Sequence, residues 1–211
     1  MFALDLDGTL VHVEPLFVRA LEARLGRSLA GRDPSVYEHF GISPLIPEEE
    51  RPAFLRAWEE VLRDPAVYAQ AQPYPGAVEV ASWLHRRGML RGYVTSRPSV
   101  LEAVTREWLA RWELPQVPLV HDGGDRLRAL LRLGAQALVE DHPGHALRAA
   151  EEGYLAFLLD RPYNRGASHP ALVRLAGWEA LGRLLRTLPL DVRARRDPLG
   201  WPERRKEGYR G

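Results

Sequence analysis

Two carboxylates stand one residue apart at the end of the first hydrophobic run of this 211-residue chain. The run MFAL leads into Asp5, Leu6 and Asp7, and Gly8 and Thr9 follow directly. A buried carboxylate is costly unless it is paired with a cation or a hydrogen-bond donor. The pair therefore indicates a site whose other members lie elsewhere in the chain.

Three later apolar runs also end in polar or charged side chains. These are Thr95, Ser96 and Arg97, then Glu140 and Asp141, then Asp160, Arg161, Tyr163 and Asn164. Ligands of open α/β sheets bind at the carboxyl ends of the strands. Several acids, a hydroxyl and a basic group on neighbouring loops suit a Mg²⁺ ion, which takes oxygen ligands, together with a phosphate.

The elements that must position these side chains alternate between strand and helix patterns. Strands are predicted at 2–6, 89–96, 116–120, 135–140, 154–160 and 171–178, and helices at 76–87, 98–112, 124–133, 143–152 and 178–187. This alternation predicts an α/β fold with a Rossmann-like parallel sheet and helices on both faces.

The segment 11–74 interrupts the alternation. Pro15 suits the first turn of a helix, which Gly26 or Gly31 can end. After a loop-like stretch at 30–47, a second helical face carries Phe54, Leu55, Trp58, Val61 and Leu62. We expect a helical cap at 11–74, inserted into a core domain of residues 1–10 and 75–190. The polar, Arg-rich residues 191–211 are expected to form a basic tail.

The amino-acid composition excludes several classes of protein. The net charge is +1, hydrophobic residues make up 45%, and cysteine is absent, so neither a disulfide framework nor a cysteine metal site is possible. A signal peptide needs an apolar core near the start of the chain, and Asp5 and Asp7 fall within that stretch, so we expect no signal peptide there. We expect a cytoplasmic protein whose partner is a small molecule rather than a nucleic-acid polymer or a membrane. The oligomeric state stays open.

The ordered motifs DLDGTL, VTSRP and VEDHP resemble those of the haloacid dehalogenase (HAD) superfamily, over about residues 1–178. Within that superfamily, the chain resembles the 5'(3')-deoxyribonucleotidase-like branch. This finer resemblance rests on the segments PYPGA, TSRP and DRPYNRG with a following GW. The resemblance implies a Mg²⁺-dependent phosphatase that acts on a small phosphomonoester, for example a (deoxy)nucleoside monophosphate, through an aspartyl-phosphate.

The resemblance also implies roles for individual residues. Asp5 is the nucleophile, and Asp7 protonates the leaving oxygen and then activates water. Mg²⁺ is held by Asp5, Asp141 and the backbone carbonyl of Asp7, and it offsets the repulsion between carboxylate and phosphate. Thr95 hydrogen-bonds a phosphoryl oxygen, with Ser96 as the nearby alternative.

Other positions have more open roles. Gly8 permits an unusual backbone angle after the strand, and Gly8, Ser96 and Arg97 are expected to contact substrate. Arg97 could equally pair with a structural acid, and Glu140 is expected to support the metal from outside its ligand shell. The alternatives of substrate contact and structural role stay open for His12, His142, Tyr163 and Asn164. Trp58 and Phe54 are expected in the cap core rather than as a base-stacking platform.

One family feature is missing. The superfamily has a lysine before the final acidic motif, but the only lysine of this chain is Lys206, and all other basic residues are arginines. Counting back from LGAQALVED predicts Arg126 as the substitute, with Arg128 second. Two alternatives to a phosphatase therefore stay open: a phosphate- or nucleotide-binding HAD-fold protein with weak or no activity, and a phosphomutase.

Overall fold

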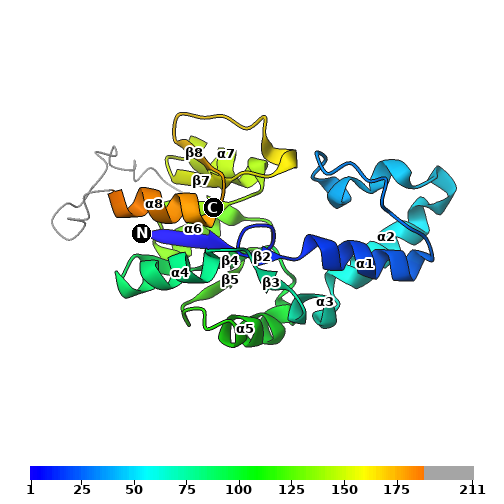
Figure 1. The fold of residues 1–211 in the computed structure, drawn as a ribbon, viewed down its shortest axis with the longest axis horizontal. Helices are drawn as coiled ribbons and strands as arrows, with labels where there is room; N and C mark the ends of the chain where they lie inside the picture. Colours follow the sequence, from blue (N-terminus) through cyan, green and yellow to red (C-terminus); the bar gives the residue numbers. More distant parts are fainter. Residues whose placement is uncertain (188–211) are drawn as a thin grey trace, which may run out of the picture.

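A single parallel sheet of six strands organises residues 1–187, which are the residues that this computed structural model describes (Figure 1). The strand order is β5-β4-β1-β6-β7-β8, and every neighbouring pair is parallel. The strands are β1 (Phe2–Asp5), β4 (Leu90–Thr95), β5 (Leu119–His121), β6 (Ala137–Glu140), β7 (Leu155–Leu159) and β8 (Leu172–Leu175). The predicted α/β fold is confirmed.

Helices cover both faces of the sheet. They are α4 (Ala77–Arg86), α5 (Glu102–Arg111, after the short 3-10 helix η4, Ser99–Leu101), α6 (Arg126–Leu133), α7 (Pro143–Glu151) and α8 (Trp178–Thr187). Alternate side chains of β1 point to opposite faces, as strand geometry requires. Leu4 packs in the cluster that contains Trp178 of α8, whereas Ala3 packs with Leu130 of α6 and Ala149 of α7.

The segment between β1 and α4 is mostly helical. It contains α1 (Glu14–Leu25), α2 (Arg51–Leu62) and α3 (Pro65–Ala69), with the 3-10 helices η1 (Glu38–Gly41), η2 (Ser43–Leu45) and η3 (Glu48–Glu50) between α1 and α2. Figure 1 shows α1 and α2 projecting away from the sheet, while α3 lies beside α5. Gly26 ends α1 in the left-handed conformation, and Leu55 is exposed although its spacing placed it on the apolar face.

Two short strands lie at the ends of this segment. β2 (Val11–His12) pairs antiparallel with β3 (Gln72–Pro73), so the segment 11–74 is not wholly helical. Two-residue strands are too short to produce an alternating pattern in the sequence. The division into a core and an inserted cap stays a prediction, and the tail with Lys206 lies outside the described residues.

The strand register brings the candidate site together. β1 lies between β4 and β6, with Asp5 level with Val94 and Leu4 level with Val139. The carboxyl ends of these three strands therefore meet at one edge of the sheet. In the described residues, no helix is long and apolar enough to cross a membrane.

Candidate active site

The turn after β1 places Asp5 and Asp7 at the sheet edge. The backbone N–H groups of Leu10 and Val11 both donate to the Leu6 carbonyl, at 2.7 and 2.8 Å. Gly8 has a φ of +81°, and a Cβ atom there would lie 2.2 Å from Asp141 Oδ2. Glycine is thus required twice, by the backbone angle and by the close approach of Asp141.

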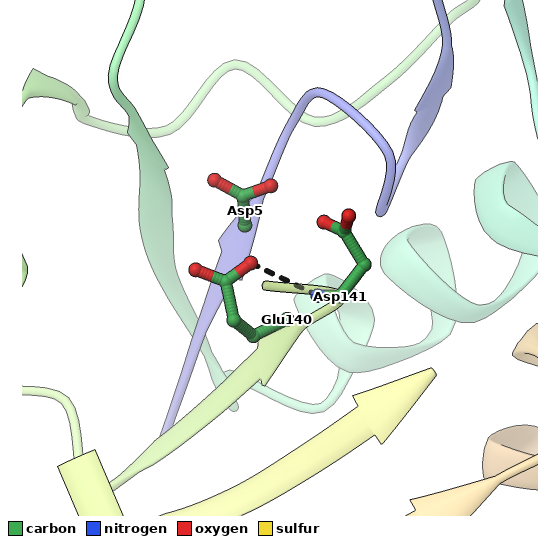
Figure 2. A group of neighbouring side chains, drawn as sticks. All are labelled: Asp5, Glu140 and Asp141. Atoms are coloured by element: carbon green, nitrogen blue, oxygen red, sulfur yellow. Dashed lines mark hydrogen bonds between the residues drawn. The ribbon is translucent and has the colours of Figure 1, made fainter. Parts of the chain in front are cut away.

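Three buried carboxylates converge beside this turn (Figure 2). Asp5, Glu140 and Asp141 each offer an oxygen, and these oxygens all lie within 4.8 Å of one another. Asp5 comes from the end of β1, whereas Glu140 and Asp141 come from the end of β6. Such a cluster of oxygen donors is what a hard divalent cation requires.

Hydrogen bonds fix Asp141 from three sides. Thr9 donates to Asp141 Oδ1 at 2.6 Å, and the Tyr163 hydroxyl donates to Oδ2 in a short hydrogen bond. The Asn164 side-chain amide donates to the Asp141 carbonyl at 2.8 Å and to the Leu159 carbonyl at the same distance. Tyr163 and Asn164, whose roles the sequence left open, therefore hold a member of the acidic cluster.

Both oxygens of Glu140 already have partners. Oε2 accepts the backbone N–H groups of Asp141 and His142, at 2.9 and 3.3 Å. Oε1 lies 2.9 Å from His145 Nδ1 and 3.4 Å from Arg126 Nη2. The position of Glu140 admits it as a third metal ligand, but these hydrogen bonds favour the expected supporting role.

Arg126 is the cation that faces the cluster. It is the first residue of α6, after Asp125, whose side chain caps the helix by accepting the Arg128 N–H at 3.1 Å. Arg126 Nη2 lies 2.8 Å from Asp5 Oδ1, and Nε lies 3.1 Å from Asp122 Oδ2. Arg128 is exposed and does not line the cavity. Of the two candidates for the missing lysine, only Arg126 thus lies in the site.

The site carries more negative than positive charge. Five carboxylates lie beside three guanidinium groups, so the carboxylates outnumber the guanidinium groups by two. The carboxylates are those of Asp5, Asp7, Asp122, Glu140 and Asp141, and the guanidinium groups those of Arg97, Arg126 and Arg161.

This imbalance shows in the pKa values. Burial, together with the charge of Glu140, raises the pKa of Asp5 well above its usual range and that of Asp141 to about 7. Burial also opposes ionisation of Glu140, but Arg126 and His145 lower its pKa to about 2. Burial likewise works against the charge of Arg126, yet Asp5, Glu140 and Asp122 raise its pKa. A divalent cation would supply the missing positive charge, so the residues present fit Mg²⁺.

Asp7 and Arg97 form a two-pronged ion pair. Arg97 Nε donates to Asp7 Oδ2 at 2.7 Å, and Nη2 donates to Oδ1 at 2.6 Å. The third nitrogen, Nη1, donates to Thr105 Oγ1 at 3.0 Å. Of the two roles that the sequence left open for Arg97, the structure shows pairing with an acid, and that acid is Asp7.

The hydroxyls after β4 lie against this framework. Thr95 is buried, and its Oγ1 accepts the Arg97 N–H at 3.2 Å. Ser96 Oγ accepts from Arg126 Nη2 at 3.4 Å. Both residues line the same cavity as Asp5 and Asp7, and their contact with a phosphoryl group stays a prediction.

The cavity has a volume of about 180 Å³ and lies between the sheet edge and the helical segment 14–69. Its walls on the helical side are mainly aromatic, from Phe17, Tyr37, His39, Phe40, Trp58 and Tyr68. Phe54 is buried outside this wall, as expected for a core residue, whereas Trp58 both packs against Phe17 and faces the cavity. His142 lines the cavity, and His12 stacks on Tyr74 outside it.

Four residues of the site were not anticipated as such: Thr9, Tyr37, Asp122 and His145. Thr9 lies within the first motif, and its position beside Gly8 is the signal that could have found it. Asp122 precedes Arg126 by four residues, the spacing of a helical ion pair. Tyr37 lies in the loop between α1 and α2, and its ring packs on Tyr163 and His142. No local sequence pattern encodes that long-range contact.

Comparison with known proteins agrees with this arrangement. No family model matches the chain. A Halalkalibacterium halodurans protein named "Putative nucleotidase" is 27% identical over 181 residues, which are 84% of this chain and 88% of that protein. Similar crystal structures include a "putative phosphoglycolate phosphatase" from Lactobacillus plantarum, with a TM-score of 0.61 and 20% identity over 87% of this chain and 97% of that one.

A HAD phosphatase from Thermococcus onnurineus has a TM-score of 0.53 and 21% identity, over 87% of this chain and 96% of that one. At these identities the similarity to solved structures establishes the fold. The ordered motifs of the sequence meet at one edge of that fold. The resemblance is thereby confirmed: the chain has the fold of the HAD superfamily hydrolases.

Proposed function

We propose that this HAD hydrolase is a Mg²⁺-dependent phosphatase that hydrolyses a small phosphomonoester through an aspartyl-phosphate on Asp5. A (deoxy)nucleoside monophosphate is the first candidate substrate, because the curated relatives are named as nucleotidases. The observation that carries the proposal is the placement of Asp5 in the cavity wall, 2.8 Å from Arg126 and within the buried acidic cluster.

Asp5, Asp141 and the backbone carbonyl of Asp7 are the proposed Mg²⁺ ligands. When bound, the ion screens the charge that otherwise keeps a carboxylate from an anionic phosphate. Arg126 adds a fixed positive charge on the other side of Asp5. It thereby does in this chain what the family lysine does in relatives.

The reaction then has two steps. An Asp5 carboxylate oxygen attacks phosphorus, the bond to the leaving oxygen breaks, and that oxygen takes the proton from the Asp7 carboxyl group. Asp7, now a carboxylate, accepts a proton from the water that attacks phosphorus, which frees Asp5 and inorganic phosphate. Thr95 and Ser96, which line the same cavity, would donate hydrogen bonds to phosphoryl oxygens.

The alternative of an inactive phosphate-binding protein depended on the missing lysine. Arg126 supplies a buried cation next to Asp5, which removes the reason for preferring that alternative. No observation among the described residues favours a phosphomutase over a phosphatase.

A substrate panel tests the proposal. Phosphate release is measured from deoxynucleoside and ribonucleoside monophosphates, sugar phosphates and phosphoglycolate, with Mg²⁺ and with EDTA, for wild type and Asp5→Asn. We expect Mg²⁺-dependent release by the wild type and none by a folded Asp5→Asn variant. Equal release by both proteins, or no release by wild type from any ester, would contradict the proposal.

A further inference from the structure

We propose that Arg97 is a positioning residue that holds the Asp7 carboxyl group in place for protonation of the leaving oxygen, and that it does not bind the substrate phosphate. The inference rests on the proposed function, because it concerns how Asp7 acts in that reaction. It assigns Arg97 a different role from the substrate contact that its motif suggests.

The geometry of the pair supports positioning. Nε and Nη2 of Arg97 reach the two oxygens of Asp7 at 2.7 and 2.6 Å, which is the side-by-side arrangement that fixes the plane of a carboxylate. Among the described residues, Arg97 is the only one whose side chain bonds the Asp7 carboxylate. Without it, Asp7 is free to change its side-chain rotamer.

The guanidinium group is itself held rigidly. Nη1 donates to Thr105 Oγ1 of α5, and the Tyr68 ring of α3 covers the guanidinium carbon at 4.3 Å. The backbone of Arg97 is bound at both ends, since its N–H donates to Thr95 Oγ1 and its carbonyl lies 2.9 Å from His121 Nδ1. A group anchored this firmly can orient another group precisely enough for catalysis.

The two helices behind Arg97 are tied together as well. Trp108 Nε1 donates to the Ala71 carbonyl and Arg111 Nη1 to the Ala69 carbonyl, both at 2.7 Å. These bonds hold the end of α3 against α5, so Thr105 and Tyr68 keep a fixed position relative to each other. Arg97 therefore has little freedom to turn toward a ligand.

Exposure separates the two partners. The Arg97 side chain is 1% exposed, whereas that of Asp7 is 29% exposed. Both residues line the cavity, but each of the three nitrogens of Arg97 already donates to a protein atom. A substrate phosphate that took the place of Asp7 on the guanidinium group would remove the proton donor that the reaction needs.

This role predicts a dependence on the leaving group. An alkoxide needs a proton when its bond to phosphorus breaks, whereas p-nitrophenolate leaves readily without one. Loss of Arg97 should therefore impair alkyl esters far more than p-nitrophenyl phosphate. A merely structural role would impair both substrates to the same extent.

The test compares kcat/KM for an alkyl phosphomonoester, such as a nucleoside monophosphate, and for p-nitrophenyl phosphate. Arg97→Lys keeps the positive charge but loses the two-pronged contact with Asp7. Leu109→Ala is the control, because Leu109 is a buried residue of α5 that takes no part in the contacts holding Arg97. We expect Arg97→Lys to lower kcat/KM roughly a hundredfold for the alkyl ester and less than about tenfold for p-nitrophenyl phosphate. Leu109→Ala should change kcat/KM for both esters to the same extent.

Two further measurements distinguish positioning of Asp7 by Arg97 from a merely structural or substrate-binding role. Adding Asp7→Asn to Arg97→Lys should cause little further loss on the alkyl ester, because both changes disable the same step. A crystal structure of Arg97→Lys should show the Asp7 carboxylate displaced. Equal losses on both esters, additive losses, an unmoved Asp7, or a raised KM with unchanged kcat would overturn the inference. Failure of the wild type on both esters would instead contradict the proposed function, and the inference with it.

Discussion

At the scale of single residues, the ion pair between Arg126 and Asp5 is the most informative feature of the site. The sequence located Arg126 by counting, because the spacing to the last acidic motif is constrained by α6 and β6. Its neighbours could not be found in this way. Asp122 and His145 gain their roles only when the folded chain brings them to Arg126 and Glu140.

Removal of the Arg126 guanidinium should therefore be costly to turnover. Arg126→Ala takes away the fixed charge 2.8 Å from Asp5, and we expect a loss of roughly a hundredfold or more in kcat. Arg126→Lys should recover part of that loss, and the exposed Arg128→Ala is the matched control. Full activity of Arg126→Ala, measured by phosphate release, would show that another group compensates the charge.

Metal binding gives a second prediction at this scale. Mg²⁺ should raise the Tm of the wild type. At a hundredfold excess over Kd, binding adds about 2.7 kcal/mol to the free energy of unfolding. Asp141→Asn should abolish this shift without lowering the metal-free Tm, because it removes one of the excess buried negative charges.

Asp160→Asn is the control for this experiment, since Asp160 pairs with Arg174 outside the acidic cluster. It should keep the Mg²⁺-induced shift. A shift that persists in Asp141→Asn would place the ion elsewhere.

At the scale of elements, the turn after β1 decides where the two aspartates point. Sequence patterns identified the strands that end in Asp5, Thr95 and Glu140, because buried parallel strands are nearly continuous apolar runs. They did not identify η1, where His39 and Phe40 adopt positive φ angles of 49° and 53°. Such angles are unusual for residues other than glycine, and both of these residues line the cavity.

Gly8→Ala tests the turn. The substitution forces an alanine into a left-handed conformation, which costs about 1–2 kcal/mol, and it also places Cβ 2.2 Å from Asp141 Oδ2. Gly124→Ala is the control, because Gly124 has a φ of +93° with nothing within 4 Å of the added atom.

Urea unfolding should show a larger stability loss for Gly8→Ala than for Gly124→Ala, and only Gly8→Ala should lose the Mg²⁺-induced rise in Tm. Equal effects of the two substitutions would mean that the contact with Asp141 is relieved at no cost.

At the scale of the whole molecule, the sheet edge carries the candidate catalytic groups and the helical segment supplies the opposite wall of the cavity. The sequence indicated both parts, but it did not show that Trp58 and Phe40 face the site. Helical periodicity identifies an apolar face without saying whether that face meets a core or a cavity. Among the residues of the helical segment that line the cavity, Glu14 is the one acid, and it forms an ion pair with Arg32.

This wall suits a planar leaving group. Trp58→Ala should raise KM for a nucleoside monophosphate about tenfold or more, because stacking of a base on an aromatic ring contributes ~1–3 kcal/mol. KM for a small aliphatic phosphate ester should change little. Leu55→Ala, on the exposed side of the same helix, is the matched control. A similar rise in KM for both esters would argue against a contact between Trp58 and a base.

The proposed reaction depends on covalent chemistry at Asp5. The most direct measurement is mass spectrometry of the protein after brief reaction with p-nitrophenyl phosphate and Mg²⁺ and an acid quench. Asp7→Asn is the informative variant, because this ester leaves without a general acid while hydrolysis of the acyl-phosphate still needs Asp7. We predict one added phosphoryl group on the peptide that contains Asp5, and none when Asp5→Asn is introduced as well. Phosphate release by the wild type with no label in Asp7→Asn, or a label on any other residue, would contradict the account.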